Sequence, residues 1–148
     1  MKIRRLAAGL VLLVACSSTT ALDSHDSLVV VDGSLRFVVS DAPAVPGVLF
    51  ISANASGGAG KVTITSTRYG SVCGQSVTSH ADVSGHSIVL HVTYAERAGA
   101  VCTADVRALT YRAEIGLLSA GEYDVQVVHA NAPDSIGNTV YMSRVTVT

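Results

Sequence analysis

Three histidines within a stretch of twelve residues are the first candidates for chemistry in this sequence: His80, His86 and His91. Zinc and copper need several imidazole or thiolate groups that converge about 2.0–2.3 Å from the ion. On one regular strand, His86 and His91 have opposite parity and would point to opposite faces. His80 lies beyond a glycine-containing turn. We therefore expect separate, exposed histidines, with no metal site and no cofactor.

A glycine-rich run, Ser56–Lys61, contains the residue types of a phosphate-binding loop. Such a loop needs a further glycine ahead of the run, Ser or Thr after the lysine, and then a helix whose amide groups hold the anion. Here Ala55 stands at the glycine position, and Val62 follows the lysine. The segment after the run also has the pattern of a strand. We expect a hairpin loop here and no nucleotide site.

Hydrolytic chemistry finds no support in the sequence motifs. No Gly-x-Ser-x-Gly turn is present, and serines are too common for a chance Ser, His and Asp set to carry weight. The acids Glu114, Glu122 and Asp124 fall on the outward faces of predicted strands, whereas paired catalytic carboxylates must face each other across a cleft. The segment 134–138 lacks the alternating acids of a good calcium loop. The prediction is that the chain is not an enzyme.

The elements that must position these residues have the period-2 pattern of half-buried strands. In residues 121–130, for example, Tyr123, Val125 and Val127 share one face. A change of apolar parity between Met142 and Val145 predicts a β-bulge. Short, evenly spaced strands favour one antiparallel sandwich or barrel, over residues 27–148. The predicted strands are Leu28–Val31, Leu35–Ser40, Val48–Ala53, Lys61–Thr67, His86–Tyr94, Arg107–Ile115, Gly121–Ala130 and Thr139–Thr148.

Residues 1–15 have the composition of a secretory signal peptide. A basic start precedes an apolar run over residues 6–15, and small polar residues follow. A membrane-spanning helix needs about 20 apolar residues, roughly twice the length of this run. A buried N-terminal helix is the structural alternative.

The sequence Leu13-Val14-Ala15-Cys16 resembles the lipobox of bacterial lipoproteins. The resemblance implies that Cys16 becomes the first residue of the mature chain and carries acyl groups, several of which would hold the protein durably on a membrane. Residues 17–26 would then be a flexible tether. Ser17 in place of Asp after the cysteine favours the outer over the inner membrane of a bacterial envelope. Ordinary cleavage without lipidation is the alternative.

Two cysteines follow the lipidation candidate: Cys73 and Cys102. An even pair in a secreted chain predicts a disulfide, because the compartment is oxidising. A metal or redox pair is the alternative, although no Cys-x-x-Cys is present.

Charge argues against nucleic-acid binding. Three of the ten Lys and Arg residues precede Cys16, which leaves seven against eleven Asp and Glu, a net charge of about −4. Binding to nucleic acid depends on neutralising phosphates with a basic surface, and no basic stripe is present.

The segment 118–127 resembles the corner of immunoglobulin-like and fibronectin type III-like sandwiches. In that corner a tyrosine at the start of the penultimate strand caps the turn with its hydroxyl group. The resemblance assigns this part to Tyr123, with Gly121 at the turn and Leu118 packed beneath. It implies an all-β, antiparallel immunoglobulin-like β-sandwich of seven to nine strands. The chain departs from antibody domains in having no Trp, and Cys73 and Cys102 do not occupy the usual positions.

The function expected from these features is that of a non-enzymatic, lipid-anchored envelope protein, a binding or structural module for an envelope or extracellular protein. Arg68 and Tyr69 are the first binding candidates, because their residue types are favoured at interfaces. The alternatives are an inhibitor of a protease or other secreted enzyme, acting through an exposed loop, and an enzyme whose site forms only in three dimensions. Binding is expected in the end loops, over residues 41–47, 54–60, 69–79 and 130–138.

Overall fold

The computed structural model describes residues 28–32, 34–44, 52–70, 75–96, 99, 106–133 and 136–148, and it describes no side chain for 28–32 or Pro43. The predicted signal peptide, the tether and all three cysteines lie outside these ranges. The lipid anchor at Cys16 and the Cys73–Cys102 disulfide therefore stay predictions. The described part of the chain contains no helix that could span a membrane.

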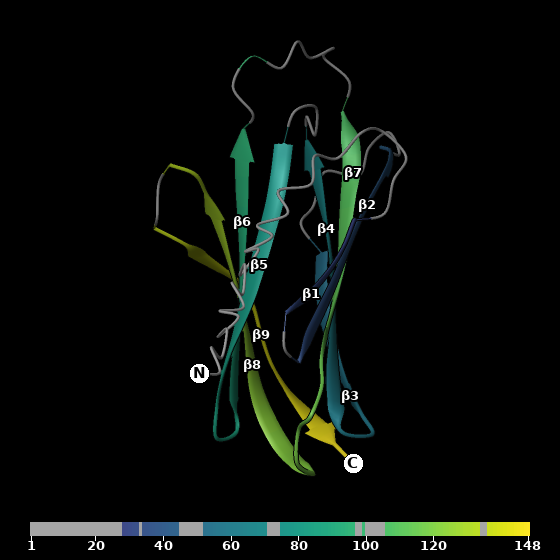
Figure 1. The fold of residues 1–148 in the computed structure, drawn as a ribbon, viewed down its shortest axis with the longest axis vertical. Helices are drawn as coiled ribbons and strands as arrows, with labels where there is room; N and C mark the ends of the chain where they lie inside the picture. The colour runs from purple at the N-terminus through teal and green to yellow at the C-terminus, as the bar shows by residue number, and fades with distance from the viewer. Residues whose placement is uncertain are drawn as a thin grey trace, which may run out of the picture.

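Two packed β-sheets form the domain (Figure 1). One sheet has the strand order β1-β2-β7-β4-β3, and the other has the order β5-β6-β8-β9. With β1 set aside, because its side chains are not described, each sheet contributes four strands. The strands are β1 (Leu28–Asp32), β2 (Leu35–Pro43), β3 (Ser52–Gly58), β4 (Lys61–Gly70), β5 (Gln75–Ser84), β6 (Ser87–Glu96), β7 (Arg107–Ile115), β8 (Gly121–Asn131) and β9 (Asn138–Val147).

One sheet is mixed, which corrects the expectation of a wholly antiparallel sandwich. Strands β6 and β8 are parallel neighbours, with Leu90 paired to Val127. All other neighbouring strands are antiparallel. The strand between them in the chain, β7, lies in the opposite sheet. The chain therefore reverses twice between β6 and β8, and the two strands run in the same direction.

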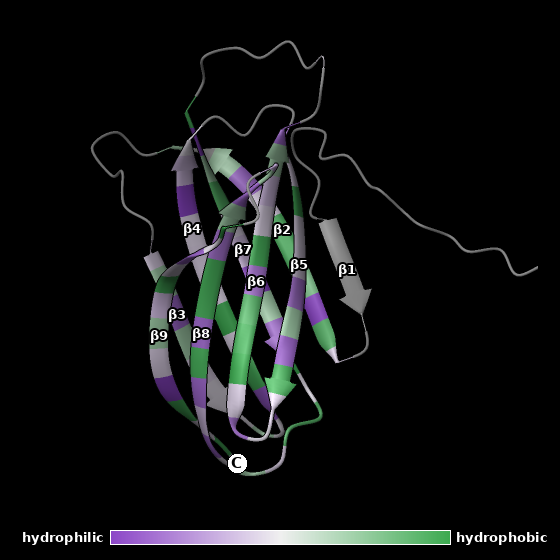
Figure 2. Cartoon of the chain, turned by 90° about the vertical axis from the view of Figure 1, so that its left-hand side faces the viewer, coloured by the Kyte–Doolittle hydropathy of each residue, from purple (hydrophilic) through white to green (hydrophobic). Residues whose placement is uncertain are grey.

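The core lies between the facing sheets and follows the period-2 pattern. In strands such as β6, every second residue is buried in this core, as are Ile88, Leu90 and Val92. Figure 2 shows this alternation as apolar bands on the strands. Burying one such side chain fully contributes about 1.5–3 kcal/mol. The predicted inward set Tyr123, Val125 and Val127 is buried, which confirms that reading of β8.

The bulge expected in the last strand is present, but at another position. Val127 pairs with Tyr141 and Val128 pairs with Thr139, so Val140 is the extra residue. From Tyr141 to Val147 the parity is constant, and Met142 points outward with 73% of its surface exposed. The prediction was wrong in its position because it placed Met142 on the core face.

At the corner before β8, the Tyr123 hydroxyl donates a hydrogen bond of 3.1 Å to the carbonyl oxygen of Ser119. This is the bond that the resemblance implied. Leu118 is partly buried against the core. Gly121 has a φ of +153°, and a Cβ there would lie 2.9 Å from Nε2 of His86. A side chain at position 121 would therefore be strained and would press on the neighbouring turn.

Candidate functional site

A pocket opens on the outer face of the β5-β6-β8-β9 sheet, beneath the hairpin that joins β8 to β9. Its volume is about 510 Å³. In Figure 1 this hairpin projects away from the sandwich. Both polar and apolar residues line the pocket, among them His80, His91, Thr93, Val128, Ala130 and Pro133.

The bulge at Val140 and a close contact at Gly137 shape this hairpin. A β-bulge bends its strand and increases the local twist, and this bulge lies next to the hairpin. The backbone of Gly137 lies over Val128, because a Cβ at that glycine would be 2.3 Å from Cγ1 of the valine. On the other side, the Ala132 amide donates to the Tyr94 carbonyl oxygen at 2.8 Å. The hairpin is thus bonded to the neighbouring strand β6 at Ala132 and packs on its own strand β8 at Gly137.

Two histidines stand side by side in the wall of the pocket. His80 on β5 and His91 on β6 are directly opposite in the strand register. Their rings are stacked, with 4.5 Å between centroids and 5° between planes. Directly opposed residues on antiparallel strands have Cβ atoms about 4.5–5.5 Å apart, which explains the contact. The expectation that these histidines lie apart is wrong for this pair.

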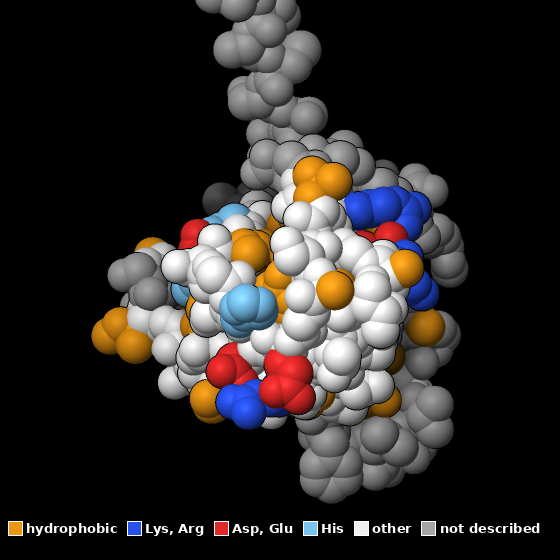
Figure 3. Space-filling model, turned by 90° about the horizontal axis from the view of Figure 1, so that it is seen from below, with side chains coloured by type: hydrophobic (Ala, Val, Ile, Leu, Met, Phe, Trp, Pro, Cys, Tyr) orange, Lys and Arg blue, Asp and Glu red, His pale blue; other side chains and the backbone are white. Residues whose placement is uncertain are grey.

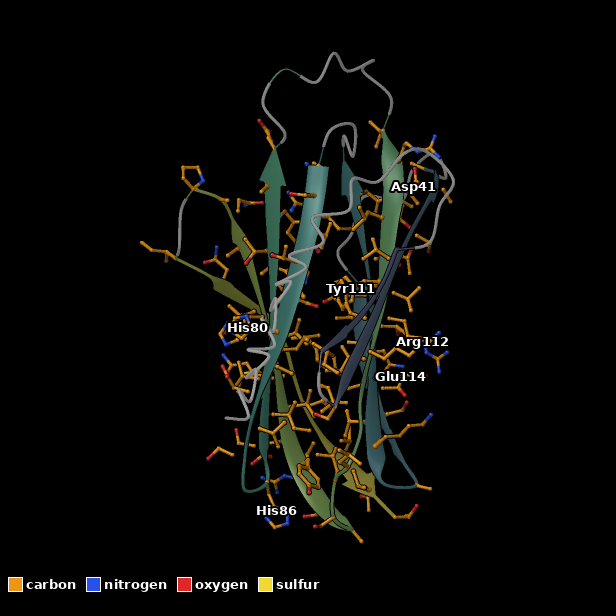
Figure 4. The ribbon with its side chains drawn as sticks, viewed as in Figure 1. Asp41, His80, His86, Tyr111, Arg112 and Glu114 are labelled. Carbon is orange, nitrogen blue, oxygen red and sulfur yellow. The ribbon has the colours of Figure 1, made fainter. Side chains whose placement is uncertain are left out.

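Asp82 completes a cluster with the two histidines. It lies two residues after His80 on the same face of β5, since side chains alternate along a strand. Its Oδ2 atom is 3.3 Å from Nε2 of His91 and 3.8 Å from Nε2 of His80. The three ligand atoms lie within 4.8 Å of one another. We name Asp82, His80 and His91 the β5–β6 cluster. In Figure 4 the labelled His80 lies on the outer side of this sheet.

The cluster was missed because β5 was not predicted. Its burial pattern is weak: Val77 is its only buried apolar residue, and its last residues are exposed on both faces. A signal was nevertheless present at the predicted turn, Ser84-Gly85. Ser84 pairs with Ser87 across a two-residue turn in which Gly85 has a φ of +57°. Such a turn joins two strands and determines their register, which places residue 80 opposite residue 91.

Arg68 and Tyr69 lie on a strand, not in a loop. Strand β4 continues to Gly70, and β5 begins at Gln75, so the predicted 69–79 loop is wrong in its bounds. The guanidinium of Arg68 lies 4.5 Å from the centre of the Tyr94 ring and donates to Oδ1 of Asn131 at 3.1 Å. Both candidates are half-buried. Arg68 thus packs across the gap between the two sheets.

The other three predicted loops are also shorter than expected. Strand β2 continues to Pro43, so it includes the first part of the 41–47 segment. Strand β3 runs to Gly58, and the hairpin turn after it is Ala59-Gly60. Strand β8 extends to Asn131. The predicted hairpin at the glycine-rich run is therefore present, although most of the run is strand.

Four ring side chains meet in the interior between the sheets. The Tyr111 hydroxyl and Nε2 of His129 form a buried hydrogen bond of 2.8 Å. The ring of Tyr94 meets His129 edge-on at 5.3 Å, and Phe37 stacks on Tyr111 at 5.2 Å. Burial raises the pKa of Tyr111 to about 12, and burial also raises the pKa of Tyr94. Both phenols are therefore neutral over the physiological range.

Burial also lowers the pKa of the His129 imidazole to about 4, with a smaller contribution from the nearby Arg68 charge. The ring is neutral in the folded protein at pH 7, because the charged form would lose its hydration. In the unfolded chain an ordinary histidine has a pKa of about 6.5. Between these two values, the unfolded state binds more protons than the folded state.

This difference predicts a loss of stability in mild acid. The contribution of neutral His129 is fully present above pH 6.5 and is lost as the pH falls towards 4, amounting to roughly 2 kcal/mol between pH 7 and 4.5. Phenylalanine cannot titrate. We therefore expect His129→Phe to lose roughly 2 kcal/mol less stability than the parent between pH 7 and 4.5. Urea unfolding of both proteins at several pH values measures it. Equal slopes for the two proteins would contradict the assignment.

On the outer face of the other sheet, charges neutralise one another. Glu114 has Arg112 at 2.8 Å, Arg36 at 3.7 Å and Lys61 at 3.8 Å. The hydrogen bond from Arg112 is the main reason that the pKa of Glu114 is lowered. In Figure 4 the labelled Arg112 and Glu114 lie on the side opposite His80, with Tyr111 between them. Glu114 was predicted correctly as outward-facing, and its side chain is 21% exposed.

The lower end of the sandwich has a similar mixture of charges. Figure 3 shows acidic and basic side chains next to each other on a mostly uncharged surface. Asp124 and Arg144 form an ion pair of 2.7 Å at an exposed position. These two surfaces therefore pair their charges, whereas the pocket wall presents two histidines, with Asp82 beside them.

Comparisons with known proteins add no assignment. No family model, curated protein or solved structure matches this chain.

Proposed function

We propose that this protein is a non-enzymatic binding module of the bacterial cell envelope, held on the membrane by lipid on Cys16 and facing its ligand with the pocket under the β8–β9 hairpin. The observation that carries the proposal is that pocket of about 510 Å³. Ligand sites are concave, mostly apolar and contain a few convergent polar groups. Here His80, His91 and Thr93 supply the polar groups, and Val128 and Ala130 supply apolar surface.

The position of the shifted pKa values supports binding over catalysis. Catalytic groups with shifted pKa values tend to lie in a cleft that the substrate can reach. Among the described residues, the buried side chains whose pKa values are shifted are Tyr94, Tyr111 and His129. All three lie between the sheets. On β8, His129 points inward, whereas the neighbouring Val128 and Ala130 line the pocket. The sheet thus separates the perturbed groups from the pocket.

The ligand that fits is a small molecule with an apolar body and an oxygen acceptor or carboxylate. The apolar part would lie against Val128 and Ala130, while the oxygen would meet the imidazole groups of His80 and His91. Binding on regular strands supports specificity, because the strands hold these side chains in place on a rigid surface.

The immunoglobulin-like assignment is part of the same proposal. The hydrogen bond from Tyr123 to Ser119 supports it. The parallel pairing of β6 with β8 is a departure from the antiparallel arrangement that the resemblance implied. A Cys73–Cys102 disulfide would add a constraint on the unfolded chain of roughly 3–4 kcal/mol.

Filling the pocket should abolish ligand binding. We expect ¹⁵N NMR of the chain, titrated with a library of small apolar carboxylates, to show shifts centred on Thr93, Val128 and Ala130. The variant Ala130→Phe should lose these shifts, with affinity falling at least tenfold, because the new ring occupies the pocket. The matched control is Thr65→Phe, a half-buried position on the other sheet.

Two results would contradict the proposal. One is a titration in which no library member shifts the pocket residues. The other is binding that Ala130→Phe leaves unchanged, or that Thr65→Phe weakens to the same extent.

A further inference from the structure

The β5–β6 cluster brings two imidazole groups and one carboxylate to one spot on the outer face of the sheet. Nε2 of His91 and Oδ2 of Asp82 are 3.3 Å apart, and Nε2 of His80 is 3.8 Å from the same oxygen. Around a tetrahedral ion with ligands at about 2.0–2.1 Å, neighbouring ligand atoms are roughly 3.3 Å apart. One of the three pairs therefore already has the required spacing, and the His80–Asp82 pair needs to close by a few tenths of an ångström. The third pair, His80 with His91, has its ligand atoms within 4.8 Å of each other and must close as well.

The backbone holds the three residues in place without help from a loop. His80 and His91 are opposed in the β5–β6 register, and Asp82 follows His80 on the same face of β5. His80 and Asp82 have side chains that are 62% and 68% exposed, and His91 is 35% exposed. The side chains are thus free to tilt from the stacked arrangement towards a common ion, while their Cβ atoms stay close together.

The donor set selects a class of ion. Imidazole nitrogens suit zinc, copper and nickel, whereas calcium and magnesium prefer shells made of oxygen. Open zinc sites have three protein ligands and keep a fourth position for water or another ligand. Two histidines and one carboxylate supply three such ligands. Both histidines line the pocket, so the open position would face the space beneath the β8–β9 hairpin.

We infer that His80, Asp82 and His91 bind one divalent first-row transition metal ion, zinc in the first place, with an open coordination position towards the pocket. The inference rests on the proposed function only for the role of the ion, which would anchor the oxygen donor of the pocket ligand. The metal site itself stands on the cluster geometry.

The simpler interpretation of the cluster is a surface contact in which Asp82 accepts a hydrogen bond from a ring N–H of one of the histidines. Such a contact would supply hydrogen-bond partners to these side chains and would not require a metal ion. The two interpretations differ in stoichiometric metal binding, which can be measured directly.

The test is calorimetric titration of the full chain, purified from membranes in detergent without a histidine tag, with ZnCl₂. We expect one strong site per chain at the cluster. His80→Ala and His91→Ala should each weaken that site at least tenfold, and Asp82→Asn should weaken it severalfold, because the amide loses the charge. His86→Gln is the matched control, since His86 is exposed and lies outside the cluster. Its affinity should be that of the parent.

NMR separates this outcome from a change in folding. On zinc addition, the imidazole signals of His80 and His91 should shift together, and those of His86 should not. Absence of a strong site, or a site that survives in the double variant His80→Ala/His91→Ala, would overturn the inference. Thermal melts of the variants should match the parent, because the exposed cluster contributes little to the core.

The two proposals can fail separately. If zinc binds at the cluster but no carboxylate binds in the pocket, the metal inference is supported and the proposed ligand is refuted. The opposite result is carboxylate binding that persists in EDTA, together with imidazole signals that do not shift on zinc addition. It would refute the metal inference and support the proposed binding module.

Discussion

Replacement of Gly57 by alanine should destabilise the domain by about 3 kcal/mol, the largest stability effect that we expect from adding a single methyl group. A Cβ at this position would lie 1.8 Å from the backbone oxygen of Thr146 and 2.5 Å from its carbonyl carbon. Both are backbone atoms, so no side-chain rotation relieves the overlap. Overpacking typically costs 1–3 kcal/mol, and here a strand must move as well.

The strand that must move is β9, and its end joins the two sheets. The Gly60 amide donates to the Thr148 carbonyl oxygen at 2.9 Å, and the Thr148 amide donates to the Gly58 carbonyl oxygen at 3.2 Å. A little farther along, the Ala55 amide donates to the Tyr141 hydroxyl at 3.1 Å. Displacing β9 from β3 therefore weakens several hydrogen bonds in addition to relieving the overlap.

Gly58 supplies a matched control, because nothing lies within 4 Å of a Cβ at that position. Gly58→Ala should be neutral or slightly stabilising, since alanine reduces the entropy of the unfolded chain. Urea unfolding of both variants against the parent gives the free energies. If Gly57→Ala were as stable as Gly58→Ala, the close contact of β3 with β9 would be wrong.

Replacement of Cys16 by alanine should release the protein from the membrane. In the proposed lipoprotein, the acyl groups on the Cys16 residue are the anchor, and each buried methylene contributes about 0.8 kcal/mol. Without them nothing in the proposal holds the chain to lipid. We expect the parent in the membrane pellet and most of the Cys16→Ala protein in the soluble fraction, as measured by ultracentrifugation and immunoblotting.

Ser17→Ala is the control for this experiment, because it changes a neighbouring residue without removing the sulfur. It should pellet with membranes like the parent. Intact mass should show the acyl groups on the parent and on the control only. A Cys16→Ala protein that stays with the membrane as the parent does would refute the anchor, whatever the state of the pocket.

Strands with a strong period-2 pattern could be predicted from the sequence. Arg107–Ile115 is predicted and found with the same bounds, and its inward set Leu109, Tyr111, Ala113 and Ile115 is buried. The reason is that alternating apolar and polar side chains along a strand can bury only one face, and a register slip would expose the apolar set. The outward position of Glu114 follows from the same alternation.

Strand β5 could not be read in this way, because it lies at the edge of its sheet and has little apolar surface to bury. Its position is determined by pairing with β6 through the Gly85 turn, and hairpin geometry is a weaker signal than burial. The parallel pairing of β6 with β8 was missed for a related reason. The direction of a strand depends on how the chain crosses between sheets, and local alternation carries no information about that crossing.

By itself, the sequence determined the all-β class, the inner faces of its strongly alternating strands, the tyrosine at the corner and the outward position of the acids, because each depends on local alternation or a local turn. Only the tertiary structure decided that His80, Asp82 and His91 meet, and that His80 and His91 share a pocket with the β8–β9 hairpin. Contacts between strands depend on register and on the order of strands in a sheet. These are set by the packing of the whole chain, and for that reason the β5–β6 cluster became visible only in the fold.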